Sequence, residues 1–313
     1  MMSSVVDAAR GGGPGSAAAL ARHARRRRYL IAYLFILPTF IVLGYFTYYP
    51  AFTALAGSFT SWDGFNPPTF VGLDNFKAIV TDPTMQQAAA NNLIWAAFGI
   101  ALSVIPAFVV AELIFHVKRP RLKYLYRTLF IVPIVVPSIV NILLWRYIYD
   151  SHGLLNLLLQ ALHLQDPTNP TLRIADPHLA LYAVALLGFP WINSFNMLIF
   201  FAGLQNIPSE VLEASELDGV SGLRRVWTID IPLVLSQFRL LLILAIVNTI
   251  SNITTPLVMT NGGPGNATDV PALEMYNNAV NGRFGYSMAI SFLLFLVVLA
   301  LTAVNNRFLK ASE

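Results

Sequence analysis

The stretch Glu210–Asp218, with the sequence EVLEASELD, carries four acidic residues in nine positions of a chain that is otherwise apolar and basic. Glu210, Glu213 and Glu216 recur every three residues, so they lie close together on a helix, with small or apolar residues at most positions between them. The inner leaflet of a membrane is itself anionic and does not attract such a helix. We therefore expect it to dock on a protein partner; the alternative is a solvated helix that only connects two membrane spans.

Capping residues predict where this acidic helix begins and ends. Ser209 follows Pro208 as a predicted N-cap, and Glu210 in the first turn suits the positive end of the helix dipole. Gly219 is predicted to lie just past the helix end, where glycine adopts a left-handed conformation at little cost, and Ser221 to cap a second short helix. The predicted unit is a helix, a tight glycine turn and a helix.

A second group of residues combines neutral polar and aromatic side chains inside the most apolar stretches. Its members are Asn248, Thr249, Ser251, Asn252, Thr254 and Thr255 in one stretch, Trp191, Asn193, Ser194, Phe195 and Asn196 in another, and Asn141 and Trp145 in a third. Neutral donors and acceptors beside aromatic faces suit a hydroxylated solute. Because an amide in hydrocarbon is costly without a partner, we expect these side chains either to line a cavity or to bond neighbouring helices, and both alternatives stay open.

Other kinds of chemistry lack their parts in this sequence. The five histidines show no HExxH or other ligand spacing, no GxSxG or GxxxxGK[ST] motif occurs, and there is no cysteine. We therefore expect no catalytic residue, no metal site and no cofactor in this chain, which is not expected to hold ATP phosphates itself.

The elements that position these residues are predicted membrane spans. The chain has 313 residues, of which 56% are apolar and 12% charged, and its mean hydropathy is +0.61. A helical span needs about 20 mostly apolar residues. Six stretches meet that requirement: 29–52, 91–117, 125–149, 178–203, 233–259 and 284–306. We expect Pro190 and Pro256 to interrupt their helices.

The distribution of basic residues predicts the orientation of the spans. With the N-terminus in the cytoplasm, every Lys and Arg except Lys77, Arg146, Arg173 and Arg283 lies on the inner side. This asymmetry is typical of multi-pass membrane proteins and predicts that both termini are inside. The net charge of +4 is therefore read as a topology signal and not as a nucleic-acid interface.

The ends of the chain and the few charges near the spans complete this organisation. Residues 1–28 are rich in Gly, Ala and Arg and are predicted to form a disordered basic cytoplasmic segment; 29–308 form the membrane domain, and 309–313 a cytoplasmic tail. Glu112 and Arg146 lie near span ends, where we expect them to reach the interface. The scarcity of ionisable groups in the spans disfavours a proton-driven carrier.

Three motifs at long, specific spacings carry a resemblance to a known family. Glu213-Ala214-Ser215, Gly219 and Ile229-Asp230-Ile231-Pro232 resemble the EAA loop of binding-protein-dependent ABC transporter permeases, with Ser for the second Ala and Ile for the Leu before Pro. Val71–Phe76 (VGLDNF) is similar to the VGLxNF segment, and Thr260–Pro264 (TNGGP) to the TxGGP turn, of the carbohydrate-uptake, maltose-type branch.

The resemblance implies an all-α membrane protein of six transmembrane helices with a cytoplasmic coupling helix in the loop 208–232, the type I ABC importer permease fold. It implies that Glu210, Glu213, Ala214, Ser215, Asp218 and Gly219 dock on an ATPase. The implied pathway for substrate is formed by Thr249, Asn252, Asn248, Asn196, Phe195, Trp191, Asn193, Asn141 and Trp145, with Thr249 and Asn252 placed by the TNGGP turn where maltose-type permeases contact sugar.

The implied function is that of a permease subunit, not an enzyme, in the inner membrane of a bacterium or archaeon. Its implied partners are a second, homologous permease subunit, two cytoplasmic ATPase subunits that bind ATP and Mg²⁺, and an extracytoplasmic binding protein that delivers a sugar or oligosaccharide. Two alternatives stay open: a stand-alone ion-coupled carrier for a small polar solute, and the same permease moving glycerol phosphate.

Overall fold

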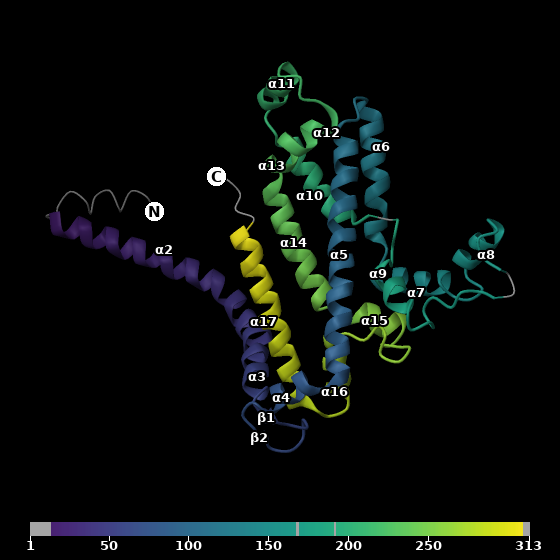
Figure 1. Ribbon diagram of the computed structural model, residues 1–313. Helices are drawn as coiled ribbons and strands as arrows, with labels where there is room; N and C mark the ends of the chain where they lie inside the picture. The colour runs from purple at the N-terminus through teal and green to yellow at the C-terminus, as the bar shows by residue number, and fades with distance from the viewer. Residues whose placement is uncertain (1–13, 167–168, 191, 309–313) are drawn as a thin grey trace. The chain divides into compact units, whose positions relative to one another are not determined.

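The computed structural model describes residues 14–166, 169–190 and 192–308 and divides the chain into two compact units, Met1–Ala56 and Gly57–Glu313. The first unit is helical wherever it is described: α2 (Pro14–Leu43) continues through a π-helical turn, η1 (Gly44–Tyr48), into α3 (Tyr49–Gly57) (Figure 1). Residues 14–28, predicted to be disordered, thus belong to a helix, which their alanines and arginines favour. The rest of the predicted disordered segment lies outside the described residues.

Helix α5 (Pro83–Phe115) is the central element of the second unit and packs against α10 (Ser194–Gln205) and α14 (Leu235–Ile250) (Figure 1). It begins where Asp82 accepts a hydrogen bond from the backbone N–H of Thr84 at 2.9 Å and Pro83 occupies the first turn. This helix covers most of the predicted span 91–117 and starts eight residues earlier, because the polar residues after Pro83 extend it beyond the apolar stretch.

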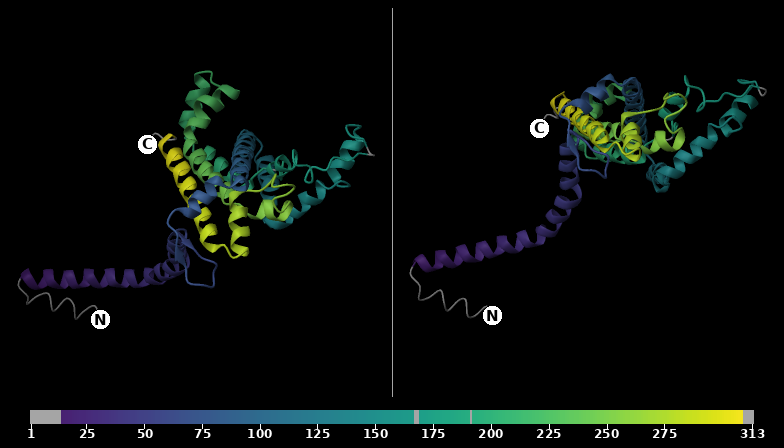
Figure 2. Two further views of the ribbon diagram at one scale, coloured as in Figure 1. Left: turned by 60° about the horizontal axis from the view of Figure 1, so that its bottom comes forward. Right: turned by 90° about the horizontal axis from the view of Figure 1, so that it is seen from below.

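The third predicted span is sharply bent. It consists of α6 (Pro120–Ile131), the 3-10 turn η2 (Val132–Val135) and α7 (Ser138–Ile148), with an angle of 91° between the two helical arms. Pro133 and Pro137 lie at the bend, where each removes a backbone donor. In the views of Figure 2, α7 and the following α8 (Leu154–Ala161) reach away from the bundle.

The fourth predicted span is not one helix. It consists of α9 (Ala180–Ala185) and α10, and the connection between them contains Gly188, with φ +91°, and Pro190. The expected interruption at Pro190 is therefore confirmed.

The fifth predicted span is interrupted just before the expected proline. It comprises α14 and α15 (Thr254–Met259), which a non-helical segment at 251–253 separates, so that Pro256 lies inside α15. Proline is tolerated within the first turn of a helix because its missing N–H has no intrahelical partner there, so the chain breaks ahead of it. The sixth predicted span is confirmed as α17 (Phe284–Phe308).

Three helical stretches are long and apolar enough to cross a membrane: Arg28–Gly57, Pro83–Phe115 and Phe284–Arg307. The number rises to five if the bent stretch 120–148 and the pair Gly222–Leu233 and Leu235–Ile250 each count as one span. The chain is therefore a mostly helical protein with several apolar spans in the part that the structure describes.

Short elements complete the second unit. The strands β1 (Thr60–Ser61) and β2 (Thr69–Phe70) pair antiparallel, and α4 (Asp74–Thr81) follows them. Within the VGLDNF motif, Asn75 Nδ2 donates to the backbone oxygens of Ser58 and Thr60, both at 2.9 Å, and so ties α4 to the strand. The others are α11 (Ser209–Leu217), α12 (Gly222–Arg225), the π-helical turn η3 (Val226–Asp230), α13 (Ile231–Leu233) and α16 (Pro271–Val280).

The main core lies between α5, α10 and α14. Phe108, Phe200 and Phe238 meet there with ring centroids 4.5 to 5.4 Å apart, and Met197, Leu204 and Leu241 around them are fully buried. Aromatic side chains bury large apolar areas and fix the relative position of the helices that carry them. This packing holds the three helices that form the walls of the cavity described next.

Candidate functional site

A cavity of about 260 Å³ lies between α5, α10 and α14. Its lining residues are Trp95, Gly99 and Ser103 on α5, Asn193, Phe195 and Asn196 at the start of α10, and Leu244, Ala245, Asn248, Thr249 and Asn252 on α14 and its end. Apart from Leu244, these residues are neutral and polar, aromatic or small, and none of the eleven is charged. We refer to this space as the polar cavity.

The wall formed by α10 exists because the chain breaks before this helix. The side-chain oxygen of Asn193 accepts a hydrogen bond from the backbone N–H of Asn196 at 3.1 Å and caps the helix. Ser194 donates to the backbone oxygen of Phe130 at 2.6 Å and anchors the helix start to α6. Phe195 remains 50% exposed, so its ring is accessible as an apolar face.

The wall formed by α14 also ends in a break. Asn248 is exposed, and its side chain makes no hydrogen bond among the described residues. Thr249 lies next to it, and the side-chain oxygen of Asn252 accepts from the backbone N–H of Thr255 at 3.0 Å, which fixes the beginning of α15. Two helix starts at interrupted spans, those of α10 and α15, thus bring asparagines to the cavity.

Sequence reasoning missed the wall formed by α5. Trp95, Gly99 and Ser103 recur every four residues, the spacing of one helix face, and this period within an apolar span was the available signal. A Cβ added at Gly99 would lie 3.2 Å from Cγ2 of Thr249 and 3.3 Å from its Oγ1. The glycine therefore allows α5 and α14 to approach closely beside the cavity.

Of the predicted pathway residues, the structure brings six together around the polar cavity: Asn193, Phe195, Asn196, Asn248, Thr249 and Asn252. Asn141 is not among the lining residues, and Trp145 instead lines a second cavity of about 570 Å³ between α7, α8 and α9. Trp191 lies outside the described residues. Trp145 and Asn141 lie away from the polar cavity because the bend after α6 directs α7, which carries both, away from α10 and α14.

Asn196 shows that cavity lining and helix bonding are not exclusive alternatives. This residue is buried, and its Nδ2 donates to the backbone oxygen of Ser103 at 3.0 Å and to the Ser103 hydroxyl at 2.8 Å. The amide therefore bonds α10 to α5 while it borders the cavity.

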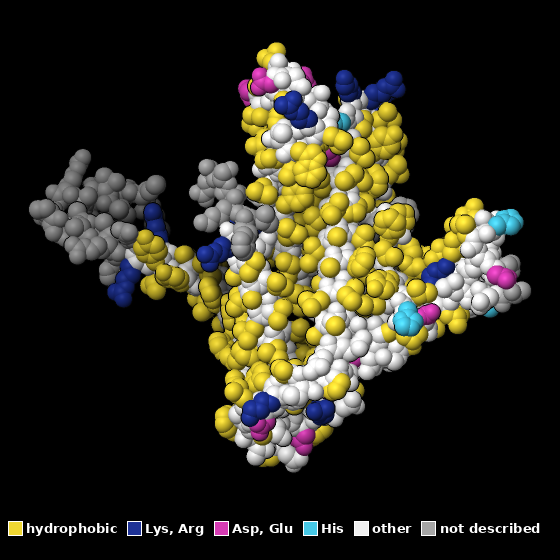
Figure 3. All heavy atoms as spheres, viewed as in Figure 1, with side chains coloured by type: hydrophobic (Ala, Val, Ile, Leu, Met, Phe, Trp, Pro, Cys, Tyr) yellow, Lys and Arg dark blue, Asp and Glu magenta, His cyan; other side chains and the backbone are white. Residues whose placement is uncertain are grey.

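The second candidate site is the acidic helix α11. Glu210, Glu213, Ala214, Asp218 and Gly219 are all exposed, and Ser215 is buried with its hydroxyl donating to the backbone oxygen of Leu212 at 2.7 Å. The same end of the molecule exposes three large apolar side chains, Leu217, Leu223 and Trp227, which are 89%, 79% and 70% exposed. Figure 3 shows acidic and apolar side chains together over α11.

The predicted turn after α11 is confirmed and its predicted caps are partly wrong. Gly219 has φ +69°, and the backbone N–H of Val220 donates to Ser215 O at 2.9 Å. Ser209 is the first helical residue and Pro208 occupies the cap position, because the proline already supplies the extended conformation there. Ser221 does precede α12, without a side-chain capping hydrogen bond.

The loop that follows α15 contains a buried acid. Thr268 Oγ1 donates to Gly263 O at 2.9 Å and lies 2.6 Å from Thr260 Oγ1, which closes the TNGGP turn. Next to it, burial, together with a hydrogen bond to the Glu274 carboxylate, raises the pKa of Asp269 to about 8. Asn91 Nδ2 donates to Asp269 O at 3.0 Å and connects this loop to α5.

Comparison with known proteins supports a transport role. Residues 89–311 match the family described as "Binding-protein-dependent transport system inner membrane component". The sn-glycerol-3-phosphate transport system permease protein UgpA of Agrobacterium fabrum is 33% identical over 90% of this chain and 95% of its own length. The "Probable ABC transporter permease protein YurN" of Bacillus subtilis is 29% identical over 91% of this chain and 97% of its own.

A solved structure shares the fold. A chain from the crystal structure of a bacterial alginate ABC transporter, in complex with a periplasmic protein bound to an alginate pentasaccharide, superimposes with a TM-score of 0.77 at 17% identity. The match covers 92% of this chain and 98% of that one. The family match spans well over half of the sequence, and the chain therefore belongs to the binding-protein-dependent transport system inner membrane components.

Proposed function

We propose that the chain is the membrane-spanning subunit of an ATP-driven importer for a neutral sugar or oligosaccharide. One observation carries the substrate class: the polar cavity offers amides, hydroxyls and aromatic faces from three helices and no charged side chain among its lining residues. Hydroxylated, uncharged solutes match such walls through neutral hydrogen bonds and apolar ring contacts.

The proposed energy source is a pair of cytoplasmic ATPase subunits that bind ATP and Mg²⁺, while this chain performs no covalent chemistry. Helix α11 is the proposed coupling helix, with Glu210, Glu213, Ala214, Ser215, Asp218 and Gly219 in or behind its contact surface. The exposed acids beside Leu217, Leu223 and Trp227 support this role, because an interface needs an apolar centre as well as charges.

The proposed assembly includes a second, homologous permease subunit and an extracytoplasmic binding protein. The solved relative is named as an ABC transporter in complex with a periplasmic protein, which supports a similar arrangement here. Six spans with both termini in the cytoplasm are part of the proposal, and the bent and interrupted stretches supply the spans beyond the three continuous ones.

The proposed mechanism is alternating access. Closure of the ATPases would move α11 as a rigid lever and switch the subunit between two states that expose the polar cavity to opposite sides. The breaks before α10 and α15 support this mechanism, since interrupted helices place backbone groups and side chains at a solute path.

Glycerol phosphate is the second candidate substrate, because several relatives are glycerol-3-phosphate permease proteins. Arg and Lys supply the charge-assisted hydrogen bonds that hold a phosphate dianion most strongly, and the polar cavity has neither among its lining residues. The two helix starts beside it already have a backbone N–H bonded to the side chain of Asn193 or Asn252. The neutral solute is therefore favoured. Membership in a binding-protein-dependent family disfavours the stand-alone ion-coupled carrier.

Uptake by the assembled transporter tests this proposal. Asn248→Leu removes an amide from the polar cavity and Asn141→Leu, the matched control, removes one from α7 outside it. In a transporter assembled with the proposed ATPase, second permease and binding protein, uptake of the sugar that the binding protein binds should fall at least about tenfold in the first variant only. That is the loss expected for a buried hydrogen bond to substrate. Equal uptake by both variants would refute the cavity as the solute site.

A further inference from the structure

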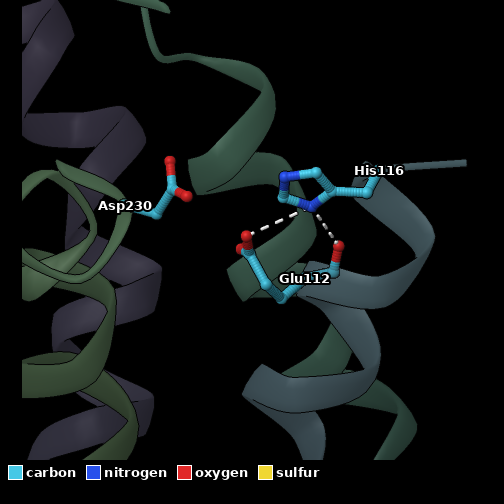
Figure 4. A group of neighbouring side chains, drawn as sticks. All are labelled: Glu112, His116 and Asp230. Atoms are coloured by element: carbon cyan, nitrogen blue, oxygen red, sulfur yellow. Dashed lines mark hydrogen bonds and ion pairs between the residues drawn. The ribbon is translucent and has the colours of Figure 1, made fainter. Parts of the chain in front are cut away.

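Three side chains with metal-binding atoms converge where α5 ends. Glu112 and His116 are four residues apart on one face of the helix end, and Asp230 is the last residue of η3 (Figure 4). Each offers one ligand atom, and these atoms lie within 4.8 Å of one another. The sequence contains no familiar ligand motif because 114 positions separate His116 from Asp230, so only the fold brings them together.

Glu112 lies in this cluster without a hydrogen-bond donor. The residue is 7% exposed, and neither of its carboxylate oxygens accepts a hydrogen bond from any described residue. Its Oε1 has an ion-pair contact with His116 Nδ1 at 3.2 Å, and Figure 4 shows the carboxylate directed into the space between the ring and Asp230. A buried carboxylate in this state is costly unless a cation accompanies it.

The neighbouring charges do not remove that cost. Asp230 is fully buried, and Arg225 Nε lies 3.4 Å from its Oδ1 and 3.3 Å from its Oδ2. Two carboxylates and one guanidinium leave one negative charge in excess while His116 is neutral. The cluster therefore lacks positive charge at Glu112, whose carboxylate oxygens have no hydrogen-bond partner among the described residues.

Two contacts orient the His116 ring and the Asp230 carboxylate, in the way that neighbouring residues orient the ligands of protein metal sites. His116 Nδ1 lies 3.0 Å from the backbone oxygen of Glu112. When Nδ1 carries the proton, this contact is a hydrogen bond that orients the ring, and the lone pair on Nε2 is free to bind a metal. Arg225 holds the carboxylate of Asp230 from outside the triad. Outer contacts of this kind fix ligand orientation in protein metal sites.

We propose that Glu112, His116 and Asp230 bind a divalent transition-metal ion of the Zn²⁺ class. One imidazole nitrogen and two carboxylates are a ligand set that Zn²⁺ accepts, with water in the fourth position. The metal connects the end of α5 to η3, at the base of the segment that carries α11. It is a structural ion in this role, and the assignment does not depend on which solute is transported.

Zinc binding by the purified full chain, with the subunits that co-purify with it, tests the site. After removal of metal with a chelator, equilibrium dialysis against Zn²⁺ and elemental analysis should give about one ion per chain. Glu112→Gln and His116→Gln should each weaken Zn²⁺ binding at least about tenfold. His178→Gln, which changes an exposed histidine outside the cluster, is the matched control and should bind as the unaltered chain does.

The outcome is decisive in either direction. The site is supported if His116→Gln and Glu112→Gln lose Zn²⁺ binding while His178→Gln retains it. If the unaltered chain binds no more Zn²⁺ than His116→Gln does, a proton satisfies Glu112 and the proposal is overturned. Should Glu112→Gln fail to fold, His116→Gln still decides, because the histidine side chain is 43% exposed and tolerates replacement.

Discussion

Replacement of Gly219 isolates the conformational requirement of the turn after α11. The residue has φ +69°, and an added Cβ would meet nothing within 4 Å, so a side chain there meets no steric obstacle in the free subunit. The left-handed conformation costs a residue with a side chain about 1–2 kcal/mol, more for a β-branched residue and less for Asn. The cost of a substitution is therefore one of backbone conformation alone.

The expected effect on docking follows from that cost. In a variant the free turn relaxes, and binding of the ATPase has to restore the conformation, so affinity should fall about 5- to 30-fold for 1–2 kcal/mol. Gly219→Asn should bind best among the variants, Gly219→Ala less well and Gly219→Val worst. Titration of the ATPase subunit onto the detergent-purified permease, followed by light scattering or thermophoresis, measures this order.

Two results would refute the reasoning. Binding by Gly219→Val that equals that of the unaltered chain would mean that α11 and its turn do not meet the ATPase. An equally large loss for Gly219→Asn and Gly219→Val would mean that the partner's surface excludes any side chain at this position, and that conformation does not set the affinity. Insertion of each variant into the membrane is the control for both measurements.

Two other substitutions test the cavity and the loop beyond it. Gly99→Val should overpack the contact with Thr249, which costs about 1–3 kcal/mol of stability, and should reduce uptake. The control Ala97→Val, on the exposed face of α5, should leave uptake unchanged. Equal uptake by both variants would show that α5 and α14 accommodate the added side chain without loss of function. Burial and the Glu274 carboxylate raise the pKa of Asp269 from 3.8 to about 8, so the folded state holds this proton more tightly than the unfolded state does. The contribution of Asp269 to stability should therefore be highest below pH 3.8 and should fall as the pH rises to about 8, by up to about 1.4 kcal/mol per pH unit. Thermal unfolding of the solubilised protein at several pH values should show a flatter dependence for Asp269→Asn, and an unchanged slope would argue against a buried neutral acid.

The spans that the sequence predicted best are those whose helical signal is local. Residues 284–306 and 91–117 contain long apolar runs, and the structure forms α17 and α5 over them. The turn at Gly219 was also predictable, because its conformation depends on the absence of a side chain. Where prolines lie inside apolar runs, composition predicts a span and misses the bend, as between α6 and α7.

The polar cavity was predictable in part. Asn193, Asn248 and Asn252 stand out because amides are rare in apolar stretches, and the structure places all three at one cavity. Asn141 is also an asparagine in an apolar stretch, yet it lies on α7 and does not line this cavity. Residue type therefore identified candidates, and the direction of each helix after its break selected among them.

The sequence by itself determined that the chain is a membrane protein, where most of its apolar spans lie and which stretch is acidic, because these properties follow from local composition and periodicity. Only the tertiary structure decided that Trp95, Gly99 and Ser103 complete the cavity and that Glu112 meets Asp230. Ser103 and Asn196 are 93 positions apart and Glu112 and Asp230 are 118 positions apart in the chain, and their proximity results from the packing of α5 against later helices, which no local pattern records.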